Sequence, residues 1–178
     1  TGAQPIYNED KSKVIIYNGE VYNFKELKEA LLKKKHVFKT KTDTEVILHG
    51  YEQWGEKLPN HLRGMFSFAI WDKNKNELFM ARDGFGIKPL YYAKFNDTFM
   101  FASEPKAFLA NPDFEKKLNT DILSAYLCFN SVPTSETFFK GVYRLDPGTY
   151  LIYKDGKIKT KSFFTLEFKE KNDDMDKI

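Results

Sequence analysis

The sequence predicts an α+β domain in which antiparallel sheets pack against each other and helices cover the outside. Two strand-rich blocks bracket two early segments with helical periodicity. Residues 65–71, MFSFAIW, are apolar at both alternating sets of positions, which is typical of a strand that is covered on both faces. Several short apolar runs are separated by polar turns, and this succession indicates hairpins and antiparallel pairing.

The individual elements follow from local patterns. In the first half, Asn23 with Glu26 and Thr42 with Glu45 form capping patterns, and each pattern opens a segment with apolar residues at helical spacing. Gly55 is placed to end the second of these helices. Strands are expected at residues 14–17, 37–38, 65–71, 78–81, 90–93, 99–102 and 150–153, with a hairpin turn at 154–157 and one further strand.

The second half also contains two short helical segments. Residues 104–110 form one, which Asn111 and Pro112 stop. Residues 120–129 form the other, with Ile122, Leu123, Tyr126 and Leu127 expected to face inward. We interpret residues 1–165 as one domain and the polar residues 166–178 as a linker.

Composition narrows the class of protein. Of 178 residues 42% are hydrophobic, which predicts a packed core, yet no apolar run approaches the about 18 residues that span a membrane. The net charge is only +3 and the only arginines are Arg63, Arg82 and Arg144, so we expect no nucleic-acid partner. A single cysteine, Cys128, excludes an internal disulfide and suits a cytoplasmic location.

Residues 17–23, YNGEVYN, are the most informative stretch of the chain. Asn-Gly alone is typical of a hairpin turn, but here it precedes a helix cap instead of a partner strand. The Asn18 side-chain N–H and the Gly19 backbone N–H can form an oxyanion hole, with the Glu20 carboxylate beside them. Asp43 has two compatible interpretations: an acidic residue that favours a helix N-terminus, and a carboxylate that binds a substrate ammonium group.

Other residues that carry chemistry have plainer interpretations. Residues 82–86, RDGFG, contain the glycines of a tight turn but lack the spacing of a nucleotide fingerprint. His36, His49 and His61 show no metal-ligand spacing and no neighbouring carboxylate pattern, so no metal site is predicted. Cys128 lies in an apolar segment and is expected to be buried and inert.

Five sequence blocks, taken in order, resemble the glutamine amidotransferase domain of glutamine-hydrolysing asparagine synthetase, an N-terminal-nucleophile hydrolase. Each block is weak alone, but the ordered set is highly specific. The resemblance covers about residues 1–165 and implies a four-layer α-β-β-α sandwich, incomplete in this chain. The blocks are residues 17–23, 42–47, 63–69, 81–92 and 101–104, and residues 139–148 also resemble the family.

The resemblance also implies a chemistry with glutamine as the substrate. In this family an N-terminal cysteine attacks the glutamine side-chain amide, and its own α-amino group acts as the base. Asn18 and Gly19 match the oxyanion hole, while Glu20 and Asp43 match the carboxylates that bind glutamine. The released ammonia passes to a C-terminal synthetase domain, which uses ATP and Mg²⁺ to convert aspartate into asparagine.

The chain departs from the family at both ends. No residue matches the nucleophilic cysteine or the arginine that holds the substrate carboxylate, and no synthetase domain follows Ile178. We therefore expect a fragment without glutaminase activity and without a cofactor of its own. Uncovered sheet edges predict self-association. Two alternatives remain open: a non-catalytic domain that binds an amino acid or a partner protein, and an amidotransferase domain that serves another acceptor.

Overall fold

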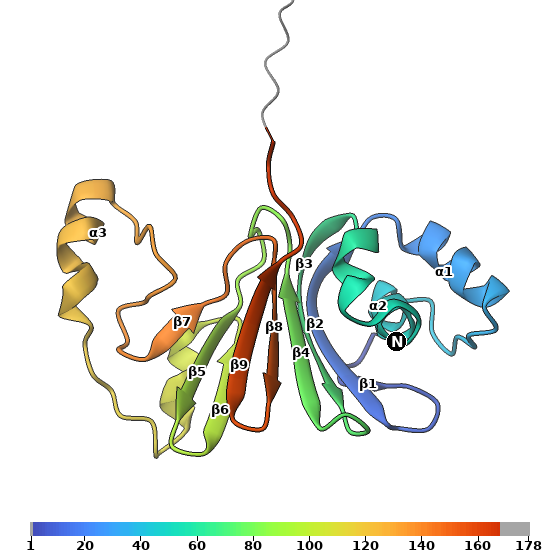
Figure 1. The fold of residues 1–178 in the computed structure, drawn as a ribbon, viewed down its shortest axis with the longest axis horizontal. Coiled ribbons are helices and arrows are strands. Elements are labelled where there is room, and N and C mark those ends of the chain that lie inside the picture. The colour runs from blue at the N-terminus through green and yellow to red at the C-terminus, as the bar shows by residue number, and fades with distance from the viewer. Residues whose placement is uncertain (1, 168–178) are drawn as a thin grey trace, which may run out of the picture.

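Two antiparallel sheets form the centre of the molecule (Figure 1). The structure is a computed structural model that describes residues 2–167. The larger sheet has the order β1-β2-β3-β4-β8-β9 and the smaller one the order β6-β5-β7. The strands are β1 (Ile6–Tyr7), β2 (Lys13–Val21), β3 (Gly64–Asp72), β4 (Glu77–Arg82), β5 (Tyr91–Phe95), β6 (Thr98–Ala102), β7 (Val142–Arg144), β8 (Thr149–Lys154) and β9 (Lys157–Ser162).

Two helices cover the outer face of the larger sheet (Figure 1). Helix α1 spans Phe24–Lys33 and helix α2 spans Asp43–Trp54, which leads directly into the 3₁₀ helix η1 (Gly55–His61). Their apolar faces bury one core against the sheet, and Ile15, Tyr17 and Val21 of β2 point into it. This core includes Ile15, Val21, Leu27, Leu31, Val46, Ile47, Tyr51, Phe66, Phe68 and Phe79.

A second core fills the space between the two sheets. Ala69, Met80 and Leu151 of the larger sheet are buried there, and aromatic side chains of the smaller sheet pack against them. The rings of Phe99 and Tyr153 stack across the interface with their centroids 4.3 Å apart. This confirms the prediction of stacked antiparallel sheets, because β3 is covered by helices on one face and by the second sheet on the other.

The outer face of the smaller sheet carries only a thin layer. Phe108 of the 3₁₀ helix η2 (Pro105–Ala110) is fully buried against Ala93 and Val142. Beyond it, η3 (Thr120–Ile122) continues into α3 (Leu123–Phe129), which contributes no buried side chain and lies at the far edge of the molecule (Figure 1). The order of layers is therefore α-β-β-α, with a fourth layer built mainly from a 3₁₀ helix and loops.

Several sequence predictions about the elements were wrong. Residues 37–38 form no strand, and β2 continues to Val21, so Asn18 and Gly19 lie inside a strand instead of at its end or in a turn. By contrast, the short helix predicted at residues 104–110 is present, as the 3₁₀ helix η2 (Pro105–Ala110). Three of the four residues expected to face inward near residue 125 are substantially exposed: Leu123, Tyr126 and Leu127. Cys128, expected to be buried, is exposed too, because α3 has no buried residue and Tyr126 makes only an edge-on contact with Phe138.

The two helices begin where predicted, but neither capping pattern forms. The Asn23 side chain instead accepts from Arg63 N and donates to the His61 carbonyl oxygen, which ties α1 to the start of β3. Glu45 turns away from Thr42, and its carboxylate accepts from the backbone N–H groups of Lys39 and Thr40. Gly55 ends α2 as predicted, with a φ of 55°. In both helices, a contact to a residue outside the helix has replaced the capping contact.

Among residues 2–167, no helix is both long and apolar enough to cross a membrane. The linker predicted at 166–178 lies outside the described residues, apart from residues 166 and 167.

Candidate functional site

Strand β2 passes through Asn18 and Gly19 without turning, because both residues pair with β3. Asn18 is opposite Ser67 and Gly19 is opposite Phe66. Gly19 has a φ of 151°, and a Cβ at this position would overlap the backbone carbonyl oxygen of Met65. Only glycine therefore allows this close approach of β2 to β3.

Among residues 2–167, the outer edge of β2 has one backbone donor, the Gly19 N–H, for which no hydrogen-bond partner is found. N–H groups of alternate residues in a strand point to the same edge. Tyr17 N on this edge donates to Gln4 Oε1 at 2.6 Å, and Val21 N donates to Asp43 Oδ2 at 3.0 Å. The Gly19 N–H lies between them and points the same way. It is the donor that a ligand at this edge can use.

Gln4 defines one side of this opening. Its side-chain Nε2 donates to the Tyr17 carbonyl oxygen at 2.8 Å, while its Oε1 accepts from Tyr17 N. The side-chain amide thus takes the place of a backbone partner, one step beyond the β1–β2 pair Ile6–Ile15. No sequence pattern marks Gln4 for this role, because the contact depends on how the first residues return along β2.

Asp43 defines the other side. It is the first residue of α2, where the helix dipole favours a negative charge. Its Oδ2 accepts from the Tyr17 hydroxyl at 2.8 Å and from Val21 N at 3.0 Å. Both bonds end on Oδ2, so Oδ1 is the oxygen available to a ligand. The two interpretations of Asp43 from the sequence are therefore compatible in the fold.

The Tyr17 side chain stays protonated over the ordinary pH range. Burial raises the pKa of the Tyr17 phenol, and the hydrogen bond to the Asp43 carboxylate raises this pKa further. Tyr17 therefore acts as a permanent donor that fixes Asp43 in place.

Replacing Tyr17 by Phe tests this contact. We expect Tyr17→Phe to lower the free energy of unfolding by about 1–2 kcal/mol at pH 7, because a hydrogen bond to a charged group is lost. Above pH 10 the unfolded wild type ionises at Tyr17 before the folded protein does. Its stability should then fall by about 1.4 kcal/mol per pH unit more than that of the variant.

Urea unfolding of both proteins between pH 7 and pH 11 measures the effect. The exposed Tyr22, with 62% of its surface accessible, provides the control Tyr22→Phe. A difference between wild type and Tyr17→Phe that widens above pH 10 would contradict the assignment.

Asn18 points to the opposite face of β2, into the space between the sheets. It lines a cavity of ≈ 290 Å³ together with Ser67, Ser103 and Phe101, and Gln4 lies at the same cavity. By strand alternation Glu20 projects from the same face as Asn18, and its side chain is exposed. Within residues 2–167 no hydrogen bond or ion pair is formed by the Glu20 carboxylate. The fold thus places Gln4 beside Asn18 and Gly19. Asp43 contacts the same edge of β2 two residues further on, at Val21.

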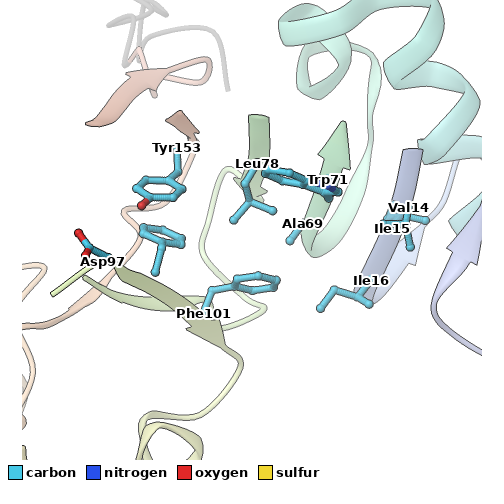
Figure 2. Close-up of a pocket in the computed structure, with 10 residues that line it drawn as sticks. Val14, Ile15, Ile16, Ala69, Trp71, Leu78, Asp97, Phe101 and Tyr153 are labelled. Atoms are coloured by element: carbon cyan, nitrogen blue, oxygen red, sulfur yellow. The ribbon is translucent and has the colours of Figure 1, made fainter. Parts of the chain in front are cut away.

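A larger cavity of ≈ 380 Å³ lies beside the first (Figure 2). It shares Ile16, Ala69 and Phe101 with the Asn18 cavity, and side chains of both sheets point into it. Its wall is almost entirely apolar, with Asp97 as the one charged residue at its border. This cavity is space within the core between the sheets and offers no reactive group.

The backbone N–H groups of the turn at residues 82–88 bind the carboxylate of Asp83, a residue of the same turn. The Asp83 Oδ1 accepts from Phe85 N and Ile87 N, and its Oδ2 accepts from Lys88 N and Phe66 N, at 3.0–3.2 Å. Because these N–H groups already bind the buried Asp83 carboxylate, the turn cannot cradle a phosphate. It locks the end of β4 onto β3 beside the candidate site.

Comparison with known proteins gives a consistent result. Residues 1–164 match the family described as a glutamine amidotransferase domain. Asparagine synthetase [glutamine-hydrolyzing] 1 of Bacillus subtilis (strain 168) is 43% identical over 99% of this chain and 28% of its own length. Asparagine synthetase [glutamine-hydrolyzing] 2 of the same organism is 44% identical over 93% of this chain and 23% of its own length. The chain therefore spans roughly a quarter of these curated relatives.

Solved structures share the fold. The glutamine phosphoribosylpyrophosphate amidotransferase from B. subtilis, complexed with ADP and GMP, superposes with a TM-score of 0.60 at 24% identity, covering 92% of this chain and 32% of that one. A glutamine aminotransferase class-II domain protein from Silicibacter pomeroyi has a TM-score of 0.57 at 17% identity and covers 93% and 72%. At these identities the likeness concerns architecture alone.

Proposed function

Because the chain belongs to the glutamine amidotransferase family, we propose that it is the glutaminase part of a glutamine-hydrolysing asparagine synthetase. In the complete enzyme this part would serve the conversion of glutamine and water into glutamate and ammonia, and we expect the 178-residue chain itself to lack that activity. A synthetase domain that uses ATP and Mg²⁺ would then consume the ammonia to make asparagine from aspartate. The sequence likeness to asparagine synthetases over nearly the whole chain favours this acceptor over others.

The open Gly19 N–H is the observation that carries the proposal. An amide carbonyl placed at the corner between the edge and the inner face of β2 meets this N–H and the Asn18 side-chain amide. Attack on the carbonyl carbon moves negative charge onto its oxygen, and the two donors stabilise that charge. Losing one such donor typically lowers the rate about 100- to 1,000-fold.

Asp43 would bind the other end of the substrate. Its Oδ1 faces away from the two bonds at Oδ2, and a carboxylate held by Tyr17 and Val21 is well fixed for an α-ammonium group. Glu20, exposed on the Asn18 side, would add a second negative charge near this group. Asp43 and Glu20 would thus bind the α-ammonium end of glutamine, while Asn18 and Gly19 would bind its side-chain amide.

The attacking thiol does not come from Cys128. This residue is exposed on α3, and α3 and β2 are separated by the smaller sheet (Figure 1). In the part of the chain that the structure describes, the site supplies donors and substrate contacts, and Cys128 contributes to neither.

Titration of the ¹⁵N-labelled chain with L-glutamine tests the binding site directly. We expect millimolar binding that shifts the backbone amide of Gly19 and the side-chain amide of Asn18. Asp43→Asn should weaken this binding at least about tenfold, because a charged hydrogen bond to the ammonium is worth about 1.5–3 kcal/mol. Asp113→Asn, at an exposed loop position, is the matched control. Shifts confined to other residues, or equal binding by Asp43→Asn, would contradict the proposal.

Self-association remains part of the proposal. Ile16 of β2 is 43% exposed, and α3 carries the highly exposed Leu127 and Phe129. Light scattering should show an average mass that rises with concentration. A constant monomer mass up to millimolar concentration would contradict this.

A further inference from the structure

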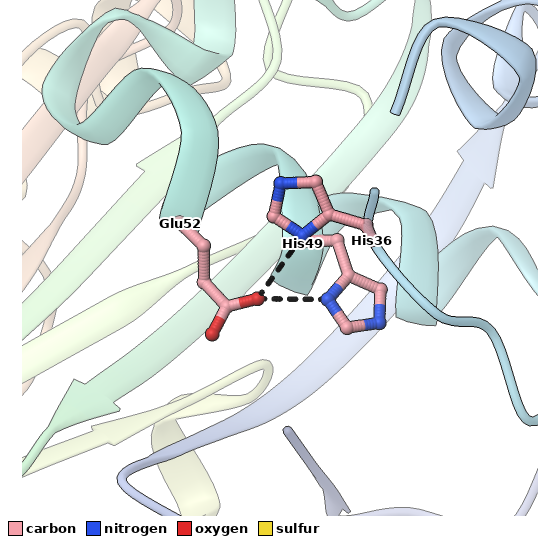
Figure 3. Close-up of side chains that lie close together, drawn as sticks. All are labelled: His36, His49 and Glu52. Atoms are coloured by element: carbon pink, nitrogen blue, oxygen red, sulfur yellow. Dashed lines mark hydrogen bonds and ion pairs between the residues drawn. The ribbon is translucent and has the colours of Figure 1, made fainter. Parts of the chain in front are cut away.

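Two histidines that are distant in sequence meet one glutamate beside helix α2 (Figure 3). His49 and Glu52 are three residues apart in α2 and share one face of the helix. His36 approaches from the loop between α1 and α2. One donor atom from each of the three side chains lies within 4.8 Å of the other two.

The ring nitrogens of both histidines have the same orientation toward Glu52. The Glu52 Oε2 lies 2.8 Å from His49 Nδ1 and 3.6 Å from His36 Nδ1. The outer nitrogen of each ring faces an acceptor instead: His36 Nε2 is 3.4 Å from Gln53 Oε1, and His49 Nε2 is 3.7 Å from Glu45 Oε1. Both imidazole Nδ1 atoms therefore face the same carboxylate oxygen, Glu52 Oε2.

Neighbouring residues hold this arrangement in place. The buried Asn8 donates from Nδ2 to Glu52 Oε1 at 2.7 Å, which leaves Oε2 directed at the two rings. Glu9 lies 3.8 Å from His49 Nε2, on the same side as Glu45. Carboxylates behind the outer nitrogen are the usual means of orienting a metal-bound histidine. The Phe38 ring packs edge-on against His49 and restricts its rotation.

A purely ionic cluster explains only part of this geometry. A protonated His49 would satisfy Glu52 and Glu45 through its two nitrogens. His36 would add only a weaker ion pair, because its 3.6 Å separation from Glu52 is too long for a hydrogen bond. That separation is instead close to the about 3.4 Å between two ligands of a tetrahedral Zn²⁺ with bonds of about 2.1 Å. The shorter His49–Glu52 contact of 2.8 Å would have to lengthen by about 0.6 Å.

We propose that His36, His49 and Glu52 form a binding site for a divalent transition metal such as Zn²⁺, with water completing the coordination. Imidazole nitrogen with carboxylate oxygen suits Zn²⁺, whereas Mg²⁺ and Ca²⁺ prefer oxygen ligands alone. The spacing of the histidines in the sequence predicted no such site, because the loop that returns His36 to α2 is visible only in the fold. A bound metal would fasten this loop to α2, whose first residue is Asp43.

Calorimetric titration of the untagged 178-residue chain with Zn²⁺ and, separately, with Mg²⁺ tests the proposal. We expect one Zn²⁺ per chain and no Mg²⁺ binding. His36→Gln and Glu52→Gln should each weaken Zn²⁺ binding by about 10- to 100-fold or more. His61→Gln is the matched control, because His61 is exposed and stacks on Trp54 away from the cluster.

A second measurement separates loss of a ligand from loss of structure. Saturating Zn²⁺ should raise the unfolding temperature of the wild type and of His61→Gln by several degrees, but not that of His36→Gln. His36 lies in a loop and is half-buried, so circular dichroism should show that His36→Gln is folded. Absence of one-to-one Zn²⁺ binding, or affinity for Zn²⁺ in His36→Gln equal to that of the wild type, would overturn the proposal. Neither result depends on glutamine binding at Asn18 and Asp43.

Discussion

Asp83→Ala is expected to lower the free energy of unfolding by about 3–5 kcal/mol, or to prevent folding altogether. The Asp83 side chain is 1% exposed and accepts hydrogen bonds from four backbone N–H groups of the 82–88 turn and β3. Its removal leaves these buried donors without an acceptor, and each unsatisfied group costs about 1–3 kcal/mol before the turn relaxes.

A second effect adds to the first. The neighbouring Arg82 is also buried, and its guanidinium donates to the carbonyl oxygens of Gly86, Lys88 and Leu145. Burial lowers the pKa of Arg82, whereas the charge of Asp83 opposes that shift. Without Asp83 the buried positive charge loses the carboxylate that most offsets the effect of its burial, which adds to the destabilisation.

Urea unfolding followed by tryptophan fluorescence measures the Asp83→Ala effect. Asp113→Ala provides the control, since Asp113 is exposed and its substitution should change stability by no more than about 0.5 kcal/mol. A loss below about 1 kcal/mol for Asp83→Ala would show that water replaces the carboxylate in the turn.

Gly19→Ala is expected to reduce stability by at least about 2 kcal/mol and to disturb the candidate oxyanion donor. The new Cβ would overlap the Met65 carbonyl oxygen and come 2.8 Å from the Phe66 Cα, so β2 and β3 would have to separate. Backbone strain at a positive φ contributes about 1–3 kcal/mol, and overpacking contributes a similar amount. The Gly19 N–H would move with the strand, so we also expect weaker binding of glutamine.

The control for Gly19→Ala is Gly141→Ala. Gly141 also has a positive φ, 82°, but a Cβ there meets nothing within 4 Å. It should lose only the conformational part, about 1–2 kcal/mol. The difference between the two variants isolates the contact of β2 with β3. Equal losses of stability would mean that the close approach can relax without cost.

The sequence predicted the sheets better than it predicted the details of the site. Strand β3 was predictable because burial on both faces requires an unbroken apolar run, and such a run is visible in the local sequence. The path of β2 through Asn18 and Gly19 was not predictable, because it depends on Met65 and Phe66, which are distant in the chain. Asn-Gly has a strong local preference for turns, and tertiary pairing overrode it here.

The polar contacts show the same limit. Asn23 and Glu45 both sit in good capping patterns, yet each side chain binds a partner outside its helix. Asp43 was assigned to the site through resemblance to the family, but its bonds to Tyr17 and Val21 required the fold. Gln4 and the pairing of His36 with His49 had no signal in the sequence, because each depends on the return path of a loop.

The side chain of Gln4 has a consequence for what can occupy the edge of β2. An exposed edge normally invites another strand, which extends the ladder one backbone group after another. Here the Gln4 amide caps the ladder at Tyr17, and Asp43 caps it again at Val21. A further strand would have to displace the Gln4 or Asp43 side chain to pair with Tyr17 and Val21. A compact molecule with a single acceptor needs only the Gly19 N–H between them. In the described part of the chain the sheet edge thus resists extension at the point where the Gly19 N–H points outward, so the opening favours a small ligand over a peptide strand.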